Sequence, residues 1–77
     1  MNETPNSEFD ISVFADRLKE LRIEKGVGQN KLADDLGLSN ASISYWENCK
    51  QEPSISAIYK LSQYFNVTAD YLIGLSD

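Results

Sequence analysis

Five residues between positions 40 and 48 recur at intervals that place them on one face of a helix. We expect Ile43, Trp46 and Glu47 to point inward. The opposite face then presents positions i, i+1, i+4, i+5 and i+8, which are Asn40, Ala41, Ser44, Tyr45 and Asn48. Amide and hydroxyl groups at this spacing suit hydrogen bonds to base edges in a DNA major groove, and an alanine methyl suits contact with a thymine methyl. The alternative interpretation is an ordinary solvated polar face.

The stretch that contains this face, QNKLADDLGLSNASISYWEN, fits two short helices joined by a sharp turn. Ala33 supplies the small side chain needed where the two backbones approach, and Gly37 tolerates the positive φ that the turn requires. Apolar residues must then point inward from both helices and the turn, and they are Leu32, Leu36, Leu38, Ile43 and Trp46. Together these positions predict a helix-turn-helix whose second helix enters the groove with its N-terminal residues foremost.

Capping and turn residues elsewhere predict an all-α fold of five helices. We expect the first helix to follow Ser12 as N-cap and to end at Lys25 before Gly26. The second helix should cover residues 29–36, and Ser39 should cap a third that continues to about Asn48. The last two are expected after Ser54 and Thr68, the final one covering residues 69–73 before Gly74.

The fourth helix and the two ends of the chain carry further expectations. The buried face of the fourth helix is predicted to hold Ile55, Ile58, Leu61 and Phe65. Residues 1–10 are polar, acidic and interrupted by Pro5, so they predict a flexible arm before a single domain over residues 11–77. In the apolar ending, Leu72 is expected in the core. Ile73 and Leu75 suit either the core or a partner surface, and Tyr71 suits both places too.

The sequence from RLKELRIEKG through the loop CKQEPS to LSQYFNVTADYLIGLSD resembles the lambdoid phage repressor and Cro-type family, also called the Xre family. The resemblance implies a five-helix DNA-binding domain, prokaryotic or from a phage, that usually binds two-fold operator sites as a dimer. It also implies that Gln29 clamps the DNA backbone, although glutamine is an ordinary first-turn residue too. Arg22 and Glu47 match the positions of a buried ion pair.

Three residues depart from that family's pattern. Gly28 stands where Ser or Thr is typical, which weakens the cap of the second helix. Cys49 stands where glycine usually ends the third helix, which implies either strain at positive φ or a different loop path. Glu52 replaces a basic or neutral residue and would oppose a nearby phosphate. Lys50 is the best remaining candidate for a phosphate contact, and Lys31 is a weaker one.

The net charge of −5 argues against DNA binding, because proteins that bind nucleic acids are usually basic. Part of this charge lies in the tails, at Glu3, Glu8, Asp10 and Asp77, and is expected to be remote from residues 40–48. A local neutral-to-basic face on an acidic protein predicts DNA binding with a shallow dependence on salt.

The composition also bears on other classes of function. The chain has no histidine and one cysteine, so neither a disulfide framework nor a zinc site is expected, and no cofactor is implied. It lacks a glycine-rich loop that could bind a phosphate, and it lacks a pair of carboxylates whose placement suggests catalysis. We therefore expect no enzymatic activity. No apolar run approaches the length of a membrane span, and a lone, reduced cysteine suits a cytoplasmic protein.

The function predicted from the sequence is that of a sequence-specific regulator of transcription, with repressor the favoured role. It should bind double-stranded DNA through Gln29, Lys50 and the outward face of residues 40–48, as a homodimer. A regulatory protein partner is left open. The alternative is a protein-interaction module that keeps the fold but not DNA binding.

Overall fold

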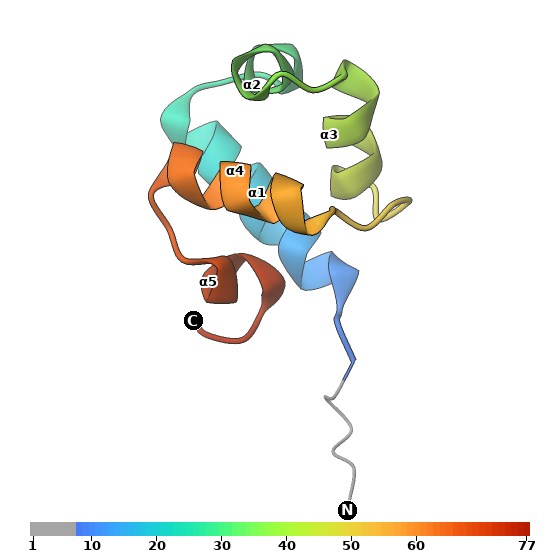
Figure 1. Ribbon diagram of the computed structural model, residues 1–77, viewed down its shortest axis with the longest axis vertical. Helices are drawn as coiled ribbons and strands as arrows, with labels where there is room; N and C mark the ends of the chain where they lie inside the picture. Colours follow the sequence, from blue (N-terminus) through green and yellow to red (C-terminus); the bar gives the residue numbers. More distant parts are fainter. Residues whose placement is uncertain (1–7) are drawn as a thin grey trace, which may run out of the picture.

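The computed structural model describes residues 8–77, which form five helices and no strand (Figure 1). The helices are α1 (Ile11–Lys25), α2 (Gln29–Leu36), α3 (Asn40–Glu47), α4 (Ile55–Phe65) and α5 (Ala69–Ile73). The predicted all-α class is therefore confirmed, with α2 and α5 at their expected bounds and α3 ending one residue early. None of these helices is both long and apolar enough to cross a membrane.

The start of α1 differs from the prediction. Asp10, not Ser12, is the N-cap: its Oδ1 accepts hydrogen bonds from the Ser12 backbone N–H at 3.0 Å and from Ser12 Oγ at 2.7 Å. A carboxylate reaches the second N–H of the helix and also suits the positive end of the helix dipole. These hydrogen bonds lower the pKa of Asp10. The rest of the predicted arm, residues 1–7, lies outside the described residues.

The core is formed where α1 packs against α3 and α5, with α2 and α4 closing the remaining sides. The rings of Phe14 from α1 and Trp46 from α3 meet edge to face, with centroids 6.1 Å apart. This arrangement suits the quadrupoles of aromatic rings. The predicted inward residues of α2 and α3 are buried, and Leu38 in the turn is half-buried. The buried cluster consists of Phe14, Leu18, Leu32, Ala33, Leu36, Ile43, Trp46, Ala57, Leu61 and Leu72.

Of the four residues predicted on the buried face of α4, Leu61 is fully buried and Ile55 is wrongly placed. Ile55 is 88% exposed, whereas Ala57 and Leu61 are buried. At 3.6 residues per turn, Ile55 lies roughly 200° around the helix from Ala57 and so points away from the core. Ile58 and Phe65 are half-buried, as a residue at the edge of an apolar stripe should be.

The turn between α2 and α3 follows the expected chemistry. Gly37 has φ 71°, a left-handed conformation that costs glycine little. Its N–H donates to Asp34 O at 3.2 Å, and the Leu38 N–H donates to Ala33 O at 2.8 Å. Lys60 from α4 adds a contact that the sequence did not predict, because its Nζ donates to Leu36 O at 3.1 Å. The carbonyl groups at the C-terminal end of α2 therefore accept hydrogen bonds both from the turn and from α4.

Arg17 fixes α5 against α1. Its Nη1 donates to the backbone oxygens of Tyr71 and Ser76, the second at 2.7 Å, and its guanidinium lies 4.4 Å from the centroid of the Tyr71 ring. Leu72 is fully buried, as predicted, and Ile73 is half-buried. Leu75 is 73% exposed, so the core is not its place.

Candidate nucleic-acid interface

The two faces of α3 separate as predicted. Ile43 and Trp46 are buried, and the Glu47 side chain is 5% exposed. The outward face of α3 holds four exposed residues and one that is half-buried, namely Asn40, Ala41, Tyr45, Asn48 and Ser44. The exposed residues carry no charge, so this face can approach a polyanion without opposing it.

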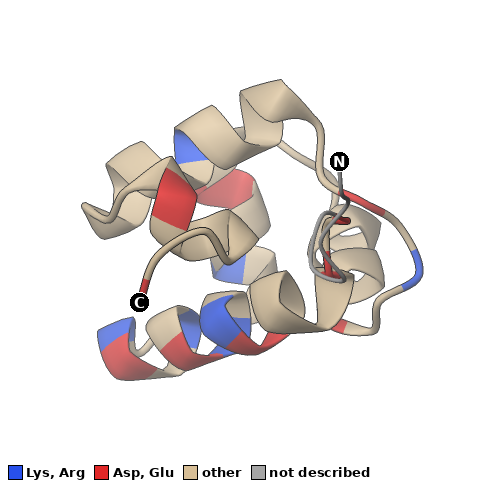
Figure 2. Cartoon of the chain, turned by 90° about the horizontal axis from the view of Figure 1, so that it is seen from below, with Lys and Arg blue, Asp and Glu red and all other residues tan. Residues whose placement is uncertain are grey.

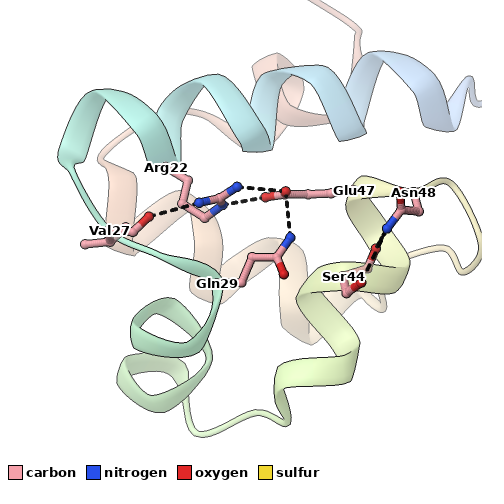
Figure 3. Close-up of polar contacts among 6 residues, drawn as sticks. All are labelled: Arg22, Val27, Gln29, Ser44, Glu47 and Asn48. Carbon is pink, nitrogen blue, oxygen red and sulfur yellow. Dashed lines mark hydrogen bonds and ion pairs between the residues drawn. The ribbon is translucent and has the colours of Figure 1, made fainter.

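A buried ion pair holds α3 against α1 (Figure 3). Arg22 Nε lies 2.7 Å from Glu47 Oε2 and Arg22 Nη2 lies 2.9 Å from Glu47 Oε1, which is a bidentate arrangement. Arg22 Nη1 also donates to Val27 O at 3.1 Å. The hydrogen bond with Glu47 raises the pKa of Arg22. The ion pair that the resemblance implied is therefore present, and it fixes the position of α3 relative to α1.

Gln29, at the first position of α2, joins the same network. Its Nε2 donates to Glu47 Oε1 at 3.0 Å, so Figure 3 shows three side chains from three helices converging in one network. One amide hydrogen of Gln29 is thus used inside the protein, which the sequence did not reveal. The second amide hydrogen has no acceptor among the described residues. The contact between Gln29 and a phosphate remains a prediction.

The two helices of the helix-turn-helix lack the side-chain caps that the other three helices have. Gly28 has no side chain to offer. Ser39 is the N-cap of α3, as predicted, but its Oγ accepts no backbone N–H. Instead, Ser39 Oγ lies 3.2 Å from Ser42 Oγ. The first-turn N–H groups of α2 and α3 therefore remain without a side-chain acceptor among residues 8–77. Such N–H groups, together with the helix dipole, favour an anion at these ends.

The loop after α3 takes the strained path that its cysteine suggested. Cys49 has φ 59°, in the left-handed region that disfavours a side chain. Its N–H donates to Trp46 O at 3.1 Å, while the Lys50 N–H donates to Tyr45 O at 2.8 Å. These two bonds close the end of α3 as glycine would close it. They also place Lys50, which is exposed, directly beyond the C-terminal end of α3.

Five of the seven basic residues already contact another group of the chain, several of them at its surface. Lys31 Nζ lies 3.1 Å from Asp35 Oδ1, and Lys25 Nζ lies 4.9 Å from the centroid of the Tyr64 ring. Lys19 and Lys50 are the two basic residues for which residues 8–77 provide no such partner. Along α1 the basic residues are interleaved with acidic ones, and one basic residue lies in the loop that follows α3 (Figure 2). Within the described part of the chain, Lys50 is therefore the one uncommitted cation close to α3.

Asp35 forms the other well-defined polar contact. Its Oδ2 accepts a hydrogen bond from the Tyr64 hydroxyl at 2.6 Å, and its Oδ1 accepts one from Lys31. The bond from Tyr64, and then that from Lys31, lowers the pKa of Asp35, while the same contact raises the pKa of Tyr64. A carboxyl group held ionised in this way suits a structural link between α2 and α4. Residues 8–77 contain no cluster of ligands that fits a metal ion.

Comparison with known proteins assigns the chain to a family. The sequence profile described as helix-turn-helix matches residues 18–72, which covers α2 and α3 entirely. The chain belongs to this helix-turn-helix family. Among its relatives, the SPbeta prophage-derived regulator YonR of Bacillus subtilis, an uncharacterized HTH-type transcriptional regulator, is 36% identical over 61 residues.

Solved structures of similar proteins support the same assignment. The restriction-modification controller protein C.AhdI from Aeromonas hydrophila is 32% identical with a TM-score of 0.75, over 82% of this chain and 96% of that one. The P22 c2 repressor, solved in complex with a synthetic operator, is 30% identical with a TM-score of 0.75, over 79% and 92%. The chain spans about half the length of the curated relatives it matches, with 79% of this chain aligned to 56% of YonR and 75% to 46% of ImmR from Bacillus subtilis.

Proposed function

We propose that this chain is a sequence-specific, double-stranded DNA-binding regulator of transcription, with repressor the favoured role, and that it acts in the cytoplasm. The observation that carries the proposal is the uncharged, exposed outer face of α3. This face is held rigidly by the buried pair of Arg22 and Glu47. A rigid helix with an uncapped N-terminus suits insertion into a major groove. The operator complex of the similar P22 c2 repressor supports the same role.

The proposed contacts divide into those with bases and those with the backbone. Asn40 is placed to pair with an adenine edge, and Ala41 to contact a thymine methyl, because the first turn of the helix enters the groove. Ser44, Tyr45 and Asn48 continue the same face. Gln29 and Lys50 flank it and are the proposed phosphate contacts. These seven residues make up the proposed DNA-binding site.

The charge distribution predicts how this binding should depend on salt. Each neutralised phosphate contributes about −0.9 to the slope of log K against log salt concentration. With Lys50 as the one free cation near α3 among residues 8–77, we expect a slope of about −1 per protomer. A much steeper slope would mean that many phosphates are neutralised and would contradict the proposed interface.

We also propose that a second copy of this chain completes the site. Phe9, Pro53, Ile55, Ile58 and Ile73 line a shallow apolar hollow of about 420 Å³, with Glu52 as its one charged lining residue in the described part of the chain. It begins where the loop after α3 enters α4. Recognition helices in such dimers lie about 34 Å apart on successive turns of the groove.

The oligomeric state tests this dimer. Replacing Ile55 by Lys puts a charge into the hollow without removing a core residue, because Ile55 is 88% exposed. We expect sedimentation to show a dimer for the natural sequence and a folded monomer for Ile55→Lys. Ile23→Lys is the matched control on α1, where Ile23 is 62% exposed. A monomer in the presence of operator DNA, for the natural sequence, would contradict the dimer.

Selection from a random duplex library at low salt tests the function itself. We expect one enriched, two-fold symmetric motif, with the binding to it weakened by Asn40→Ala and Tyr45→Ala. Removing one side-chain interaction with a base should reduce discrimination by about 1–3 kcal/mol. If the folded protein enriches no sequence, the alternative holds: a protein-interaction module that keeps the fold. The net charge of −5 and Glu52 beside α3 are the observations that favour that alternative.

A further inference from the structure

The Glu47 carboxylate accepts one hydrogen bond more than its pairing with Arg22 accounts for (Figure 3). Its Oε2 accepts from Arg22 Nε at 2.7 Å, and its Oε1 accepts from both Arg22 Nη2 at 2.9 Å and Gln29 Nε2 at 3.0 Å. The Glu47 side chain is 5% exposed, whereas Gln29 is half-buried. A fixed carboxylate therefore holds the amide of a side chain that would otherwise be free to turn.

The chemistry of this bond determines which way the Gln29 amide faces. An ionised carboxylate only accepts hydrogen bonds, whereas an amide donates through its nitrogen and accepts through its oxygen. Gln29 accordingly turns Nε2 toward Glu47 and Oε1 away from it (Figure 3). If the amide were turned over, its oxygen would face Glu47 Oε1, and the two acceptors would have no hydrogen between them. Glu47 thus excludes one of the two orientations of the amide.

The same chemistry decides what Gln29 can offer to a phosphate. A phosphate oxygen accepts hydrogen bonds, so the amide oxygen of Gln29 would oppose it and only Nε2 can bind it. Nε2 has two hydrogens, of which Glu47 accepts one, and the second has no acceptor among residues 8–77. Because Nε2 is already held in place, little side-chain freedom is left to lose when it binds a second acceptor.

We propose that Glu47 is a positioning residue for DNA binding: its carboxylate orients Gln29 so that the second Nε2 hydrogen binds one phosphate of the DNA backbone. Through Arg22, the same carboxylate holds α3 against α1. Glu47 therefore couples the phosphate contact at the start of α2 to the placement of α3, and backbone contacts of this kind fix the register of a protein on the duplex. The proposal rests on the proposed DNA binding and adds to it a role for Glu47.

The first measurement identifies the phosphate that Gln29 contacts. The full chain selects a motif from a random duplex library, and each phosphate of this motif is replaced in turn by an uncharged methylphosphonate. Gln29→Met removes the amide but keeps the length of the side chain. It should weaken binding to the unmodified motif about tenfold or more, as expected for a hydrogen bond to a charged group. At the phosphate that Gln29 contacts, methylphosphonate should make this loss much smaller.

The second measurement isolates the role of Glu47. Arg22→Met/Glu47→Met removes the carboxylate without leaving the Arg22 charge unpaired, and apolar replacement of a buried ion pair often preserves the fold. Gln29 is then free to turn, so the loss caused by Gln29→Met should be about two- to tenfold smaller than in the natural sequence, the range for ordering one side chain. If Glu47 only supported α3, the double variant would bind more weakly, but the effect of Gln29→Met at its phosphate would not change.

Two controls separate this effect from folding and from a general effect of methionine. Gln63→Met makes the same substitution at an exposed position of α4 and should leave the affinity unchanged. Circular dichroism confirms that each variant is folded. A further readout needs no DNA: nuclear magnetic resonance relaxation of the Gln29 amide nitrogen should show an ordered side chain in the natural sequence and a mobile one in Arg22→Met/Glu47→Met.

The outcomes distinguish this proposal from the proposed function. If the natural sequence enriches no motif, both fail. If it enriches a motif but Gln29→Met weakens binding equally in both backgrounds, Glu47 does not position Gln29, while DNA binding stands. The same holds if Gln29→Met has no effect in the natural sequence, or if the Gln29 amide is as mobile there as in Arg22→Met/Glu47→Met.

Discussion

The buried pair between Arg22 and Glu47 should respond strongly to the removal of either partner. Their side chains are 13% and 5% exposed, and each keeps one further partner, Val27 O for Arg22 and Gln29 Nε2 for Glu47. Breaking a fully buried pair costs about 3–5 kcal/mol, because the remaining charge is left uncompensated. Since both groups keep a partner, we expect Glu47→Gln or Arg22→Met to cost about 3 kcal/mol.

The cost of either substitution is a large share of the unfolding free energy of a domain of this size. Seventy-seven residues give roughly 4–12 kcal/mol of unfolding free energy, at about 0.05–0.15 kcal/mol per residue. Urea denaturation of both single variants and of the double variant Arg22→Met/Glu47→Gln measures the coupling directly. Removing both charges leaves neither unpaired, so the double variant should be destabilised by at least about 2 kcal/mol less than the sum of the single effects.

A variant of an exposed acidic residue on α1 serves as the control. Glu24→Gln removes a carboxylate from an exposed position of α1 and should change stability by less than about 0.5 kcal/mol. If the effects at Arg22 and Glu47 add to within about 0.5 kcal/mol, the two residues act independently. The pair would then not be what holds α3 in place.

Three further predictions concern stability. Cys49→Gly relieves the strain of a left-handed backbone at φ 59° and should raise the unfolding free energy by about 1 kcal/mol. In a thermal melt this should raise Tm by about 4–8 °C, and a lower Tm would contradict the strain. The folded pKa of Asp35 is lowered, so Asp35 contributes to the stability of the fold above its unfolded pKa of about 3.9, and this contribution disappears as pH falls through the folded pKa. In urea denaturation across pH, Tyr64→Phe should therefore make the loss of stability at acid pH less steep. An unchanged loss of stability would exclude the contact between Tyr64 and Asp35 as its cause. Arg17→Lys removes the stacking on Tyr71 and should speed hydrogen exchange in α5 while leaving α2 unchanged, whereas equal protection of α5 would show that Arg17 does not fix it.

Local chemistry in the sequence was enough to predict the turn of the helix-turn-helix and the starts of the last two helices. Gly37, Ser54 and Thr68 act through neighbouring backbone groups, and a turn or cap of this kind depends on a few adjacent residues. The spacing of apolar residues in α2 and α3 determined which face is buried, and so which face is outward. The prediction failed at Ser12, because the Asp10 carboxylate caps α1 instead. At Ser39 the N-cap position was right, but its Oγ lies beside Ser42 Oγ and makes no capping bond.

Contacts between residues far apart in the chain were decided only by the tertiary structure. Periodicity alone did not show which side of the apolar stripe of α4 faces the core; the packed helices bury Ala57 and Leu61 and leave Ile55 exposed. Nor could periodicity show that Gln29, 18 positions before Glu47, donates to that carboxylate. The use of most basic side chains inside the protein is likewise a matter of distances across helices. Sequence spacing determines the helices and their faces because those interactions are local, whereas the partners of each polar side chain are set only when the helices pack.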